Sequence, residues 1–363
     1  MQIQHHLPES SHGDTIAPER RGPLAPGRAQ AQPSPRRRAR ERPPTDLDIV
    51  DFLQIFGSTT GCSNHLGISQ SSCSRRYRHF SAEYNLGIAR VDGNYQASSN
   101  GDILESLRQT AQKLRLQRGQ FRYVLSWPCG DLGNDLQHHF PSASQIPIAP
   151  MGCHGLLSLL DQRLVDLVIC GLMELQGLLP LPLTQLDGQR LELTTAVHAL
   201  PLCRWELRLM AHHQHPLVKR DELESRDLQA FPSPALPLGI APHLMQQLSQ
   251  RGLGTSSSRL AHHSLRLWEA AAADGHSLSY AAPHQLRRLF REFGLTPLPH
   301  PLGIHETLAL VTQAETLQAP NPIFQVLRTS LRQHPDAHCD GLEWLEDGAS
   351  TGPDPAGSPI ASC

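Results

Sequence analysis

The chain is 363 residues long, has a formal net charge of −2 and contains eight cysteines. This length suits about two to three domains. No Cys-x-x-Cys pair occurs, which argues against a zinc ribbon or a disulfide scaffold. No uncharged apolar run reaches the roughly 18 residues that cross a bilayer, and the first residues lack a signal-peptide core. We therefore expect a cytoplasmic protein with reduced thiols and no membrane partner.

Charge is unevenly distributed along the chain. Residues 1–44 carry eight arginines against four acidic residues, a net of +4, whereas residues 45–118 carry +1 and the remainder carries −7. A basic front and an acidic back suggest that nucleic acid is bound at one end and that the other end has a different task.

Residues 1–44 are rich in Pro, Arg, Gln and Ser and poor in large apolar side chains. Such a segment cannot bury enough surface to offset its ordering entropy, so we expect it to be disordered. Its arginines allow two interpretations, a solubilising tail or an arm that touches phosphates; we slightly favour the tail.

A first helix is predicted to begin at Thr45, whose spacing from Asp48 matches a capping box, and to end at Gly57. A second, short helix is expected over residues 62–66, with a cap at residues 58–60. Gly67 then supplies a left-handed turn.

A third helix is expected to be capped by Ser69 and to run to about Glu83, with Asn85 closing it. Its apolar stripe consists of Cys73, Tyr77, Phe80 and Tyr84. Its other faces carry Gln70, Ser71, Ser74, Arg75 and Arg78. Hydroxyls, an amide and arginines on one short helix are the chemistry of a helix that lies in the DNA major groove.

The stretch from Arg90 to Asn100 is polar and is predicted to form a hairpin with Gly93–Asn94 as its turn. Ser98 or Ser99 should then cap a long helix over residues 101–118. Apolar side chains recur along that helix every three or four residues, at Ile103, Leu107, Ala111 and Leu114. This narrow stripe is typical of helix pairing and predicts a dimer.

Behind residue 118, apolar runs of four to six residues alternate with helical segments. Buried strands alternating with helices are typical of parallel α/β layers. Residues 336–363 hold Gly, Pro, Ser and Asp with few apolar side chains, so we expect a second disordered tail there.

The order of these elements resembles the LysR-type transcriptional regulators over most of residues 46–335. At the front, the resemblance is carried by Ser69–Gln70, Ser74–Arg75, Glu83, Arg90, Ser98 and Gly101. At the back, it is carried by the expected strand at 121–126, the helix, turn and strand over 156–170 with Asp166, the strand at 207–211, the loop His215-Pro216-Leu217, and the turn and strand over 272–280.

The resemblance has departures in the expected DNA-binding part. Cys62–Ser63 stand where the family usually has two alanines, and Ser71 stands where it usually has proline. The hairpin is also about two residues short. Since Cys and Ser are small, helices can still pack closely, so we expect the fold to survive and the DNA sequence preference to differ.

The resemblance implies an α+β chain with a winged helix-turn-helix, a long linker helix and a two-lobed α/β effector domain similar to type 2 periplasmic binding proteins. The implied domains are a tail at 1–44, the DNA-binding domain at 45–100, the linker helix at 101–118, the effector domain at 119–335 and a tail at 336–363. Lobe one would hold about 119–200 and 290–335, and lobe two about 201–289.

The implied function is sequence-specific binding of double-stranded DNA by a homodimer or homotetramer. The residues expected at the DNA are Ser69, Gln70, Ser71, Ser74, Arg75, Arg76, Arg78 and Arg90. Arginine binds guanine edges or phosphates, glutamine reads adenine, and serine hydroxyls bind phosphates. Any single arginine there could instead only solvate an exposed helix face.

The family's effectors, often small carboxylates, bind between the two lobes at strand ends and helix N-termini. The matching positions are Ser126, Trp127, Cys129, Cys153 and Cys203. For each of them, an ordinary loop role is at least as well supported. The effector itself is unknown.

Three histidine groups, at 138–139, 212–215 and 262–263, invite a metal site, but no Cys or carboxylate stands at a ligand spacing from them. We expect no metal and no cofactor. No nucleophile elbow, Walker loop or His-Glu-x-x-His motif occurs, so we do not expect an enzyme. The alternative function is a cytosolic small-molecule sensor whose helix-turn-helix no longer recognises an operator.

Overall fold

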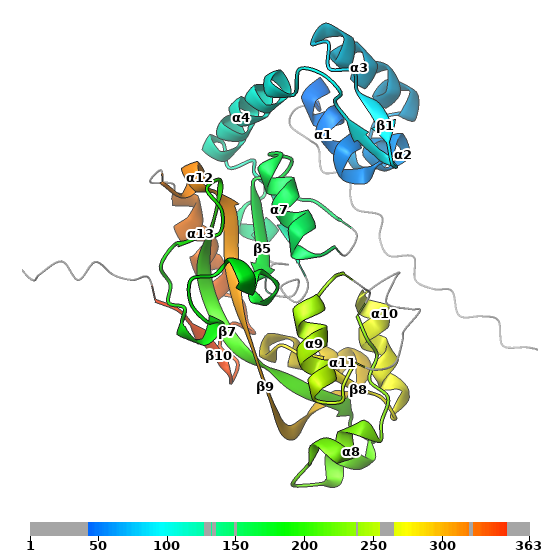
Figure 1. Ribbon diagram of the computed structural model, residues 1–363, viewed down its shortest axis with the longest axis vertical. Helices are drawn as coiled ribbons and strands as arrows, with labels where there is room; N and C mark the ends of the chain where they lie inside the picture. Colours follow the sequence, from blue (N-terminus) through cyan, green and yellow to red (C-terminus); the bar gives the residue numbers. More distant parts are fainter. Residues whose placement is uncertain are drawn as a thin grey trace, which may run out of the picture. The chain divides into compact units, whose positions relative to one another are not determined.

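The computed structural model describes residues 43–126, 132, 136–148, 151–236, 239–254, 265–318 and 322–346. Helices and strands are both abundant, and the fold is α+β as expected (Figure 1). The tail expected over residues 1–44 lies outside the described residues except for its last two.

The first helix, α1 (Asp46–Phe56), begins and ends where the sequence predicts. The Thr45 hydroxyl accepts the Asp48 N–H at 3.1 Å, and the Asp48 carboxylate accepts the Thr45 N–H at 2.7 Å, so the capping box is formed. Gly57 closes the helix at φ 62°, in the left-handed region. The buried side of α1 holds Ile49, Val50, Phe52 and Leu53, with the carboxylate of Asp51 among them.

Two further helices follow. Helix α2 (Thr59–Leu66) is capped by Ser58 and starts three residues earlier than the expected range; Gly67 ends it at φ 67°. Helix α3 (Gln70–Glu83) is capped by Ser69, whose hydroxyl accepts the Ser72 N–H at 3.1 Å. Cys73, Tyr77 and Phe80 form its buried stripe, which confirms the predicted periodicity.

A two-stranded antiparallel hairpin, β1 (Ala89–Val91) and β2 (Asn94–Gln96), comes next. Its turn is Asp92–Gly93 and not Gly93–Asn94, because Asp92 and Gly93 both have positive φ and Val91 pairs with Asn94. A two-residue turn with positive φ at both central residues matches the twist of the two strands. The prediction from the sequence placed the turn one residue too late because it did not use this requirement.

Helix α4 (Gly101–Gln117) has the expected length, but neither Ser98 nor Ser99 caps it. Asn100 precedes it at φ 49° without a side-chain cap, and its Nδ2 donates to the Tyr84 carbonyl oxygen at 3.0 Å. The two serine hydroxyls donate to the carbonyls of Gly87 and Asn85. These serines therefore hold the segment between α3 and the hairpin.

The remaining described strands form one mixed sheet. The strands are β3 (Arg122–Leu125), β4 (Ser144–Gln145), β5 (Leu167–Gly171), β6 (Leu191–Glu192), β7 (Val197–His212), β8 (Leu278–Ala281), β9 (Leu295–Gln313) and β10 (Leu342–Trp344). Their order is β10-β7-β9-β5-β3-β4, and β6 and β8 also pair with β7. Among these described strands only β3 pairs in parallel, with β4 and β5, so the expected parallel layering is correct for one end alone.

Two long antiparallel strands, β7 and β9, run through the whole α/β part. Their first and last thirds belong to different groups of elements: β5 pairs with residues 308–311 of β9, whereas β8 pairs with residues 208–211 of β7. Residues 295–301 of β9 pair with residues 208–212 of β7. This pairing places 295–301 with the expected lobe two, so their assignment to lobe one is wrong.

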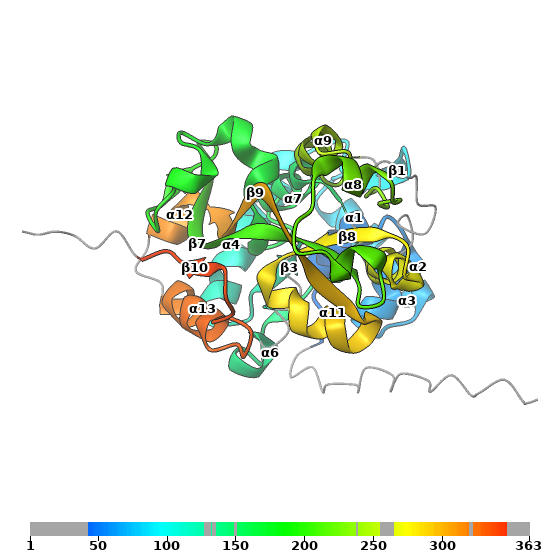
Figure 2. The ribbon, with the colours of Figure 1, turned by 90° about the horizontal axis from the view of Figure 1, so that it is seen from below.

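Helices cover the sheet. They are α6 (Leu136–His139), α7 (Cys153–Asp161), α8 (Ser225–Gln229), α9 (Pro242–Gln250), α10 (Leu265–Ala270), α11 (Leu286–Phe293), α12 (Ala314–Gln318) and α13 (Pro322–Arg332). Short 3-10 helices are η1 (Met173–Leu178), η2 (Leu183–Gln185), η3 (Pro216–Lys219), η5 (Ala271–Asp274) and η6 (Pro283–Gln285). Figure 2 shows α7 and α9 on one side of β7 and β9, and α11 and α13 on the other.

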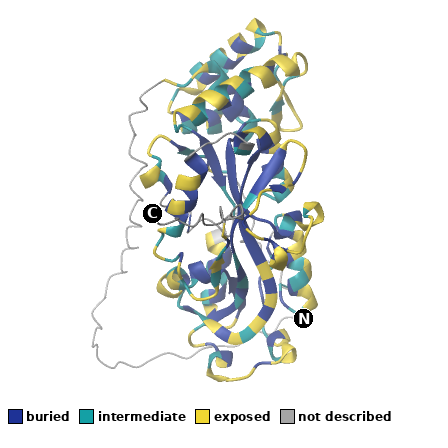
Figure 3. Ribbon diagram, turned by 90° about the vertical axis from the view of Figure 1, so that its left-hand side faces the viewer, coloured by how far each residue is buried: buried dark blue, intermediate teal, exposed yellow. Residues whose placement is uncertain are grey.

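The core lies along the strands, which are mostly buried in Figure 3, whereas the exposed residues gather on helices and loops. The expected C-terminal tail is wrong for residues 336–346, because β10 pairs with residues 203–205 of β7 and Leu345 is buried. Residues 347–363 lie outside the described residues. None of the described helices has the length and apolarity that a membrane span requires.

Candidate nucleic-acid interface and effector site

The exposed face of α3 gathers most of the residues predicted at DNA. Ser69, Gln70, Ser71, Arg75 and Arg78 are exposed, whereas Ser74 is half-buried. Positions three and four residues apart lie on one face of a helix, so Gln70, Ser74 and Arg78 form one row and Ser71 and Arg75 the next. This face points away from the stripe that packs on α1 and α2.

The packing behind this face holds α3 in place. Cys62 of α2 and Cys73 of α3 are fully buried, and the Cys62 thiol lies 3.6 Å from the Ile49 carbonyl oxygen. Burial raises the pKa of both thiols, so they remain protonated packing groups. Ser63 is also buried and donates to the Thr60 carbonyl oxygen. The small residues Cys62–Ser63 therefore permit close helix packing, as the sequence predicts.

Three arginines of α3 have different surroundings. Arg76 Nε donates to Asp46 Oδ1 at 2.5 Å and its Nη2 to the Pro44 carbonyl oxygen at 2.7 Å, so it ties α3 to the start of α1. Arg78 lies 5.8 Å from the Tyr77 ring centre. Among the described residues, neither Arg75 nor Arg78 makes an ion pair. The prediction of a DNA contact thus fits Arg75 and Arg78 better than Arg76.

The polar residues at the start of α3 contact one another. Gln70 Nε2 donates to Thr59 Oγ1 at 2.9 Å, and the hydroxyls of Ser69 and Ser71 lie 3.0 Å apart. These contacts orient the amide and the hydroxyls on an exposed part of the helix. In the hairpin, Arg90 Nε donates to the Gly93 carbonyl oxygen at 3.0 Å, and the side chain lies at the surface.

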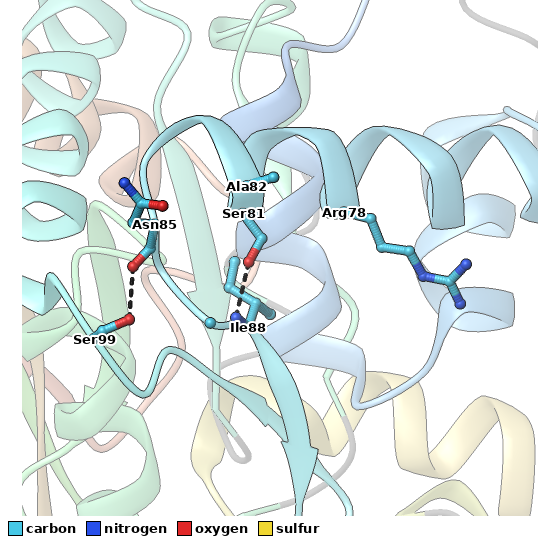
Figure 4. Close-up of a pocket in the computed structure, with 7 residues that line it drawn as sticks. Arg78, Ser81, Ala82, Asn85, Ile88 and Ser99 are labelled. Carbon is cyan, nitrogen blue, oxygen red and sulfur yellow. Dashed lines mark hydrogen bonds between the residues drawn. The ribbon is translucent and has the colours of Figure 1, made fainter.

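A hollow of about 460 Å³ lies at the other end of α3, lined by Arg78, Ser81, Ala82, Asn85, Gly87, Ile88 and Ser99. Figure 4 shows the two hydrogen bonds that shape it: the Ser99 hydroxyl donates to the Asn85 carbonyl oxygen, and the Ile88 N–H donates to the Ser81 hydroxyl. Arg78 is the one charged residue of this lining. The hollow therefore borders the exposed face of α3 that carries Arg75 and Arg78.

The residues predicted for an effector are only partly brought together. The Ser126 N–H donates to the Ile169 carbonyl oxygen at 2.9 Å, and the Cys153 thiol lies 4.0 Å from the Gly171 carbonyl oxygen. Both therefore lie at the carboxyl ends of β3 and β5. Trp127 and Cys129 lie outside the described residues. Cys203 is fully buried within β7, so its expected place at an accessible site is wrong.

Two acidic residues that the sequence prediction missed lie close to the carboxyl end of β5. Glu306 of β9 accepts the N–H groups of Met173 at 2.9 Å and Thr307 at 2.8 Å, and a side chain at Gly171 would collide with its carboxylate. Burial raises the pKa of Glu306 to about 7, although the two N–H donors oppose that rise. A single glutamate in the segment 302–311, which has no other acidic or basic residue besides a histidine, was the available sequence signal.

Glu174 of η1, the second of these residues, joins the two halves of the α/β part. Its carboxylate accepts the N–H groups of His243 at 3.0 Å and Leu244 at 2.9 Å, at the start of α9. The backbones also meet there, because a side chain at Gly152 would collide with the Gly239 carbonyl oxygen. A carboxylate on free N–H groups is how a helix N-terminus binds an anion, and here the chain supplies that anion.

One histidine of the predicted groups, His215, has a local structural role. His215 is buried, its Nδ1 accepts the Leu217 N–H at 3.2 Å, and its Nε2 lies 3.2 Å from the His276 carbonyl oxygen. Burial lowers the pKa of His215, so the ring is a neutral turn-forming group. Within the described ranges, no three His, Cys, Asp or Glu residues gather as a metal site would require.

No protein-family model matches the chain, and no curated protein matches it. Solved structures do. A full-length OxyR variant from Pseudomonas aeruginosa is 16% identical, with 80% of this chain and 95% of that chain covered and a TM-score of 0.49. A probable transcriptional regulator from the same organism is 17% identical, with 79% and 95% covered and a TM-score of 0.47.

The regulatory domain of MetR, a LysR family regulator from Neisseria meningitidis, is 14% identical to this chain. The match covers 62% of this chain and 99% of that one, with a TM-score of 0.43. Because these identities and TM-scores are low, the function has to be inferred from the residues of this chain.

Proposed function

We propose that the protein is a DNA-binding transcriptional regulator of LysR type, in which α1–α3 with β1 and β2 form a winged helix-turn-helix. The observation that carries the proposal is the exposed face of α3. It presents hydroxyls, an amide and two arginines without acidic partners among the described residues. Such a set can donate to phosphates and to guanine and adenine edges.

The geometry of the helices supports this proposal. The Gly67 turn joins α2 to α3, and the fully buried Cys62 and Cys73 lie in the packing between the two. A recognition helix needs such a rigid support, because base readout depends on side chains held in register. Arg90 lies in the hairpin, which would form the wing. Its positive charge could contact the DNA backbone there.

Selection of bound duplexes from a random pool, followed by footprinting, tests the proposal. A dimeric regulator protects two half-sites that are spaced by about one or more helical turns. Recovery of no preferred sequence, with weak binding that disappears at moderate salt, indicates only electrostatic attachment and contradicts the proposal.

An effector is proposed to bind near Ser126 and Cys153, where the carboxyl ends of β3 and β5 lie close to η1 and α9. Glu174 already occupies the N-terminus of α9. A small carboxylate can therefore bind to these N–H groups only by displacing Glu174; otherwise it binds at another place in this region. Thermal unfolding of the protein and of Glu174→Gln with a panel of small carboxylates tests this. Stabilisation of the variant alone identifies displacement; stabilisation of neither protein by any of them contradicts a carboxylate effector.

The alternative is a small-molecule sensor that no longer recognises an operator. One observation favours it: the Gln70 amide nitrogen is engaged by Thr59, so its two-atom contact with adenine requires a side-chain rearrangement. The same selection experiment separates the two functions, because a sensor without operator recognition yields no preferred duplex.

A further inference from the structure

Three arginines and three aspartates form a cluster between α1 and the α/β part, which we call the charge cluster. Its members are Asp48 and Asp51 of α1, Arg108 and Arg115 of α4, Arg122 of β3, and Asp166 just before β5. Asp51, Arg108, Arg122 and Asp166 are buried, with at most 5% of their surface exposed. The formal charges cancel, so the cluster is neutral as a whole.

Arg122 is the residue that joins the two parts. Its Nη1 donates to Asp51 Oδ2 at 2.7 Å and to the Leu164 carbonyl oxygen at 3.2 Å, and its Nη2 donates to Asp48 Oδ1. The guanidinium also lies 4.7 Å from the Phe52 ring centre. Burial opposes ionisation of Asp48, yet Arg122 and Thr45 outweigh burial and lower the pKa of Asp48. A single side chain of β3 thus binds two carboxylates that lie about one turn apart on α1.

The other half of the cluster joins α4 to the same strands. Arg115 forms a two-bond pair with Asp166, at 2.9 Å and 2.6 Å, and the Asp166 carboxylate also accepts the Arg122 N–H at 2.8 Å. Arg108 Nε donates to Asp51 Oδ1 at 2.8 Å. Asp51 and Asp166 therefore each bind groups from both α4 and β3, and the starts of β3 and β5 are held together beside α1.

The two strands connect this cluster to the proposed effector region. Strands β3 and β5 are parallel neighbours. Arg122 at the start of β3 and Asp166 just before β5 belong to the charge cluster. At the other end, β3 leads to Ser126, and β5 ends at Gly171 beside Cys153. A four-residue strand spans roughly 13 Å. We therefore expect that a displacement of one strand against the other at the carboxyl ends also changes the distances between the charged groups of the cluster.

We propose that Arg122 is a positioning residue that transmits the state of the effector region to the DNA-binding unit through α1. The role of Arg122 in regulation rests on the proposed function. The contact between Arg122 and α1 can be tested without DNA and does not depend on that function. A small displacement of α1 separates Asp51 from Arg122 while both side chains are still largely buried. Unpaired buried charge is strongly unfavourable, so the cluster holds α1 in one orientation rather than letting it drift.

The mechanical test measures the distance between α3 and the α/β part in the full-length protein, free of DNA. Fluorophores are introduced through unnatural amino acids at His79 and Gln325, which are both exposed, and single-molecule energy transfer is recorded. The test variants are Arg122→Gln and Arg122→Lys; lysine keeps the charge but cannot bridge Asp48 and Asp51 together. The matched control is Arg163→Gln, which removes contacts with Gln112 of α4 and with Glu315 but none with α1.

We expect one narrow distance distribution in the unaltered protein and in Arg163→Gln, and a clearly broader or shifted one in both Arg122 variants. A distribution that stays narrow and unshifted in a folded Arg122→Lys overturns the proposal. Circular dichroism and cooperative unfolding show whether each variant has folded. If Arg122→Gln fails to fold, the distance distribution of Arg122→Lys decides whether Arg122 positions α1.

A second measurement tests transmission. Glu174→Gln weakens the contact at α9, and its effect on affinity for the selected duplex is compared in chains with Arg122 and with Arg122→Lys. We expect Glu174→Gln to change the affinity for the duplex several-fold when Arg122 is present. In the Arg122→Lys background, the change in the logarithm of the affinity should be less than half as large. Equal changes in both backgrounds overturn transmission. Absence of any preferred duplex instead defeats the proposed function, and the distance measurement still tests the junction.

Discussion

At the scale of single residues, the arginines of α3 are chemically alike and differ in their neighbours. Arg76 stands three residues after Cys73 and four before Phe80, on the buried side of the helix, and Asp46 binds it there. Arg75 and Arg78 lie on the exposed face. Periodicity alone places Arg76 apart from the other two, but its partner lies 30 residues earlier, which local pattern cannot reveal.

We predict that Arg75→Ala weakens binding to a selected duplex. Loss of a base contact costs about 1–3 kcal/mol and relaxes preference at one base pair, whereas loss of a phosphate contact lowers the salt slope by about 1. A fluorescence titration at several salt concentrations distinguishes these outcomes. Arg76→Gln is the matched comparison: we expect it to lower the free energy of unfolding more than it weakens DNA binding, and equal loss of DNA affinity in both variants contradicts the division.

Glu306 predicts a pH dependence of stability. Its pKa in the folded chain is about 7 against an ordinary value of 4.5, so the folded state binds the proton more tightly than the unfolded state. Its contribution to stability is therefore greatest below about pH 4.5 and is lost as pH rises to about 7. From about pH 5.5 to about pH 8, this one group should lower the free energy of unfolding by about 2 kcal/mol.

The test of Glu306 compares urea unfolding of the unaltered protein with Glu306→Gln at about pH 5.5 and about pH 8. Glutamine has nearly the same shape and no titration, so the difference between the two proteins isolates this group. Glu343→Gln, a change at an exposed carboxylate paired with Arg204, serves as the control. Parallel pH dependence in the unaltered protein and Glu306→Gln would show that Glu306 ionises without penalty.

At the scale of elements, α4 has two unlike faces. One packs within its own chain through Leu104 and the charge cluster, whereas the apolar stripe predicted from the sequence is largely at the surface. Ile103 is 38% and Leu114 is 43% exposed. The stripe was predictable because its spacing is local. The arginines beside it, Arg108 and Arg115, were not, because their partners come from α1 and from the residue just before β5.

The proposed dimer predicts that Leu107→Glu dissociates the protein, because a charge in the middle of a paired apolar seam must be desolvated. Analytical ultracentrifugation at micromolar concentration should show a sedimentation coefficient that moves toward that of a monomer. Lys113→Glu, on the same helix but outside the stripe, should leave association unchanged. A stable dimer in Leu107→Glu contradicts pairing through α4.

Strand β10 shows where composition misleads. Residues 342–346 are few and stand among Gly, Pro, Ser and Asp, so they look like a tail, yet their partners are residues 203–205 of β7. Trp344 Nε1 donates to the Ala337 carbonyl oxygen at 2.7 Å, and Leu345 is 5% exposed. Local elements such as capped helices were predictable, whereas a pairing over this separation depends on the assembled sheet.

We predict that a chain ending at Asp340 is less stable than one ending at Glu346. Burial of Leu345 alone contributes about 1.5–3 kcal/mol, and β7 also loses the strand that covers its edge. Differential scanning fluorimetry of the two truncated chains checks this. Identical melting temperatures would mean that β10 does not hold the fold together.

At the scale of the whole molecule, the proposed DNA-binding unit and the α/β part are connected by more than the chain. The charge cluster joins α1, α4, β3 and the start of β5, and Glu174 joins η1 to α9. In the proposed function, one part reads DNA and the other changes state. The order of elements suggested that division from the sequence, but the contacts between them required the three-dimensional structure.

The most direct test of the central claim is a binding titration of the full chain on its selected duplex and on a scrambled duplex of equal length, at low and physiological salt. The account predicts that the selected duplex retains at least about a thousand-fold preference at physiological salt, and that the preference falls when Arg75 and Arg78 are both replaced by alanine. Equal affinity for both duplexes, lost together as salt rises, would contradict it.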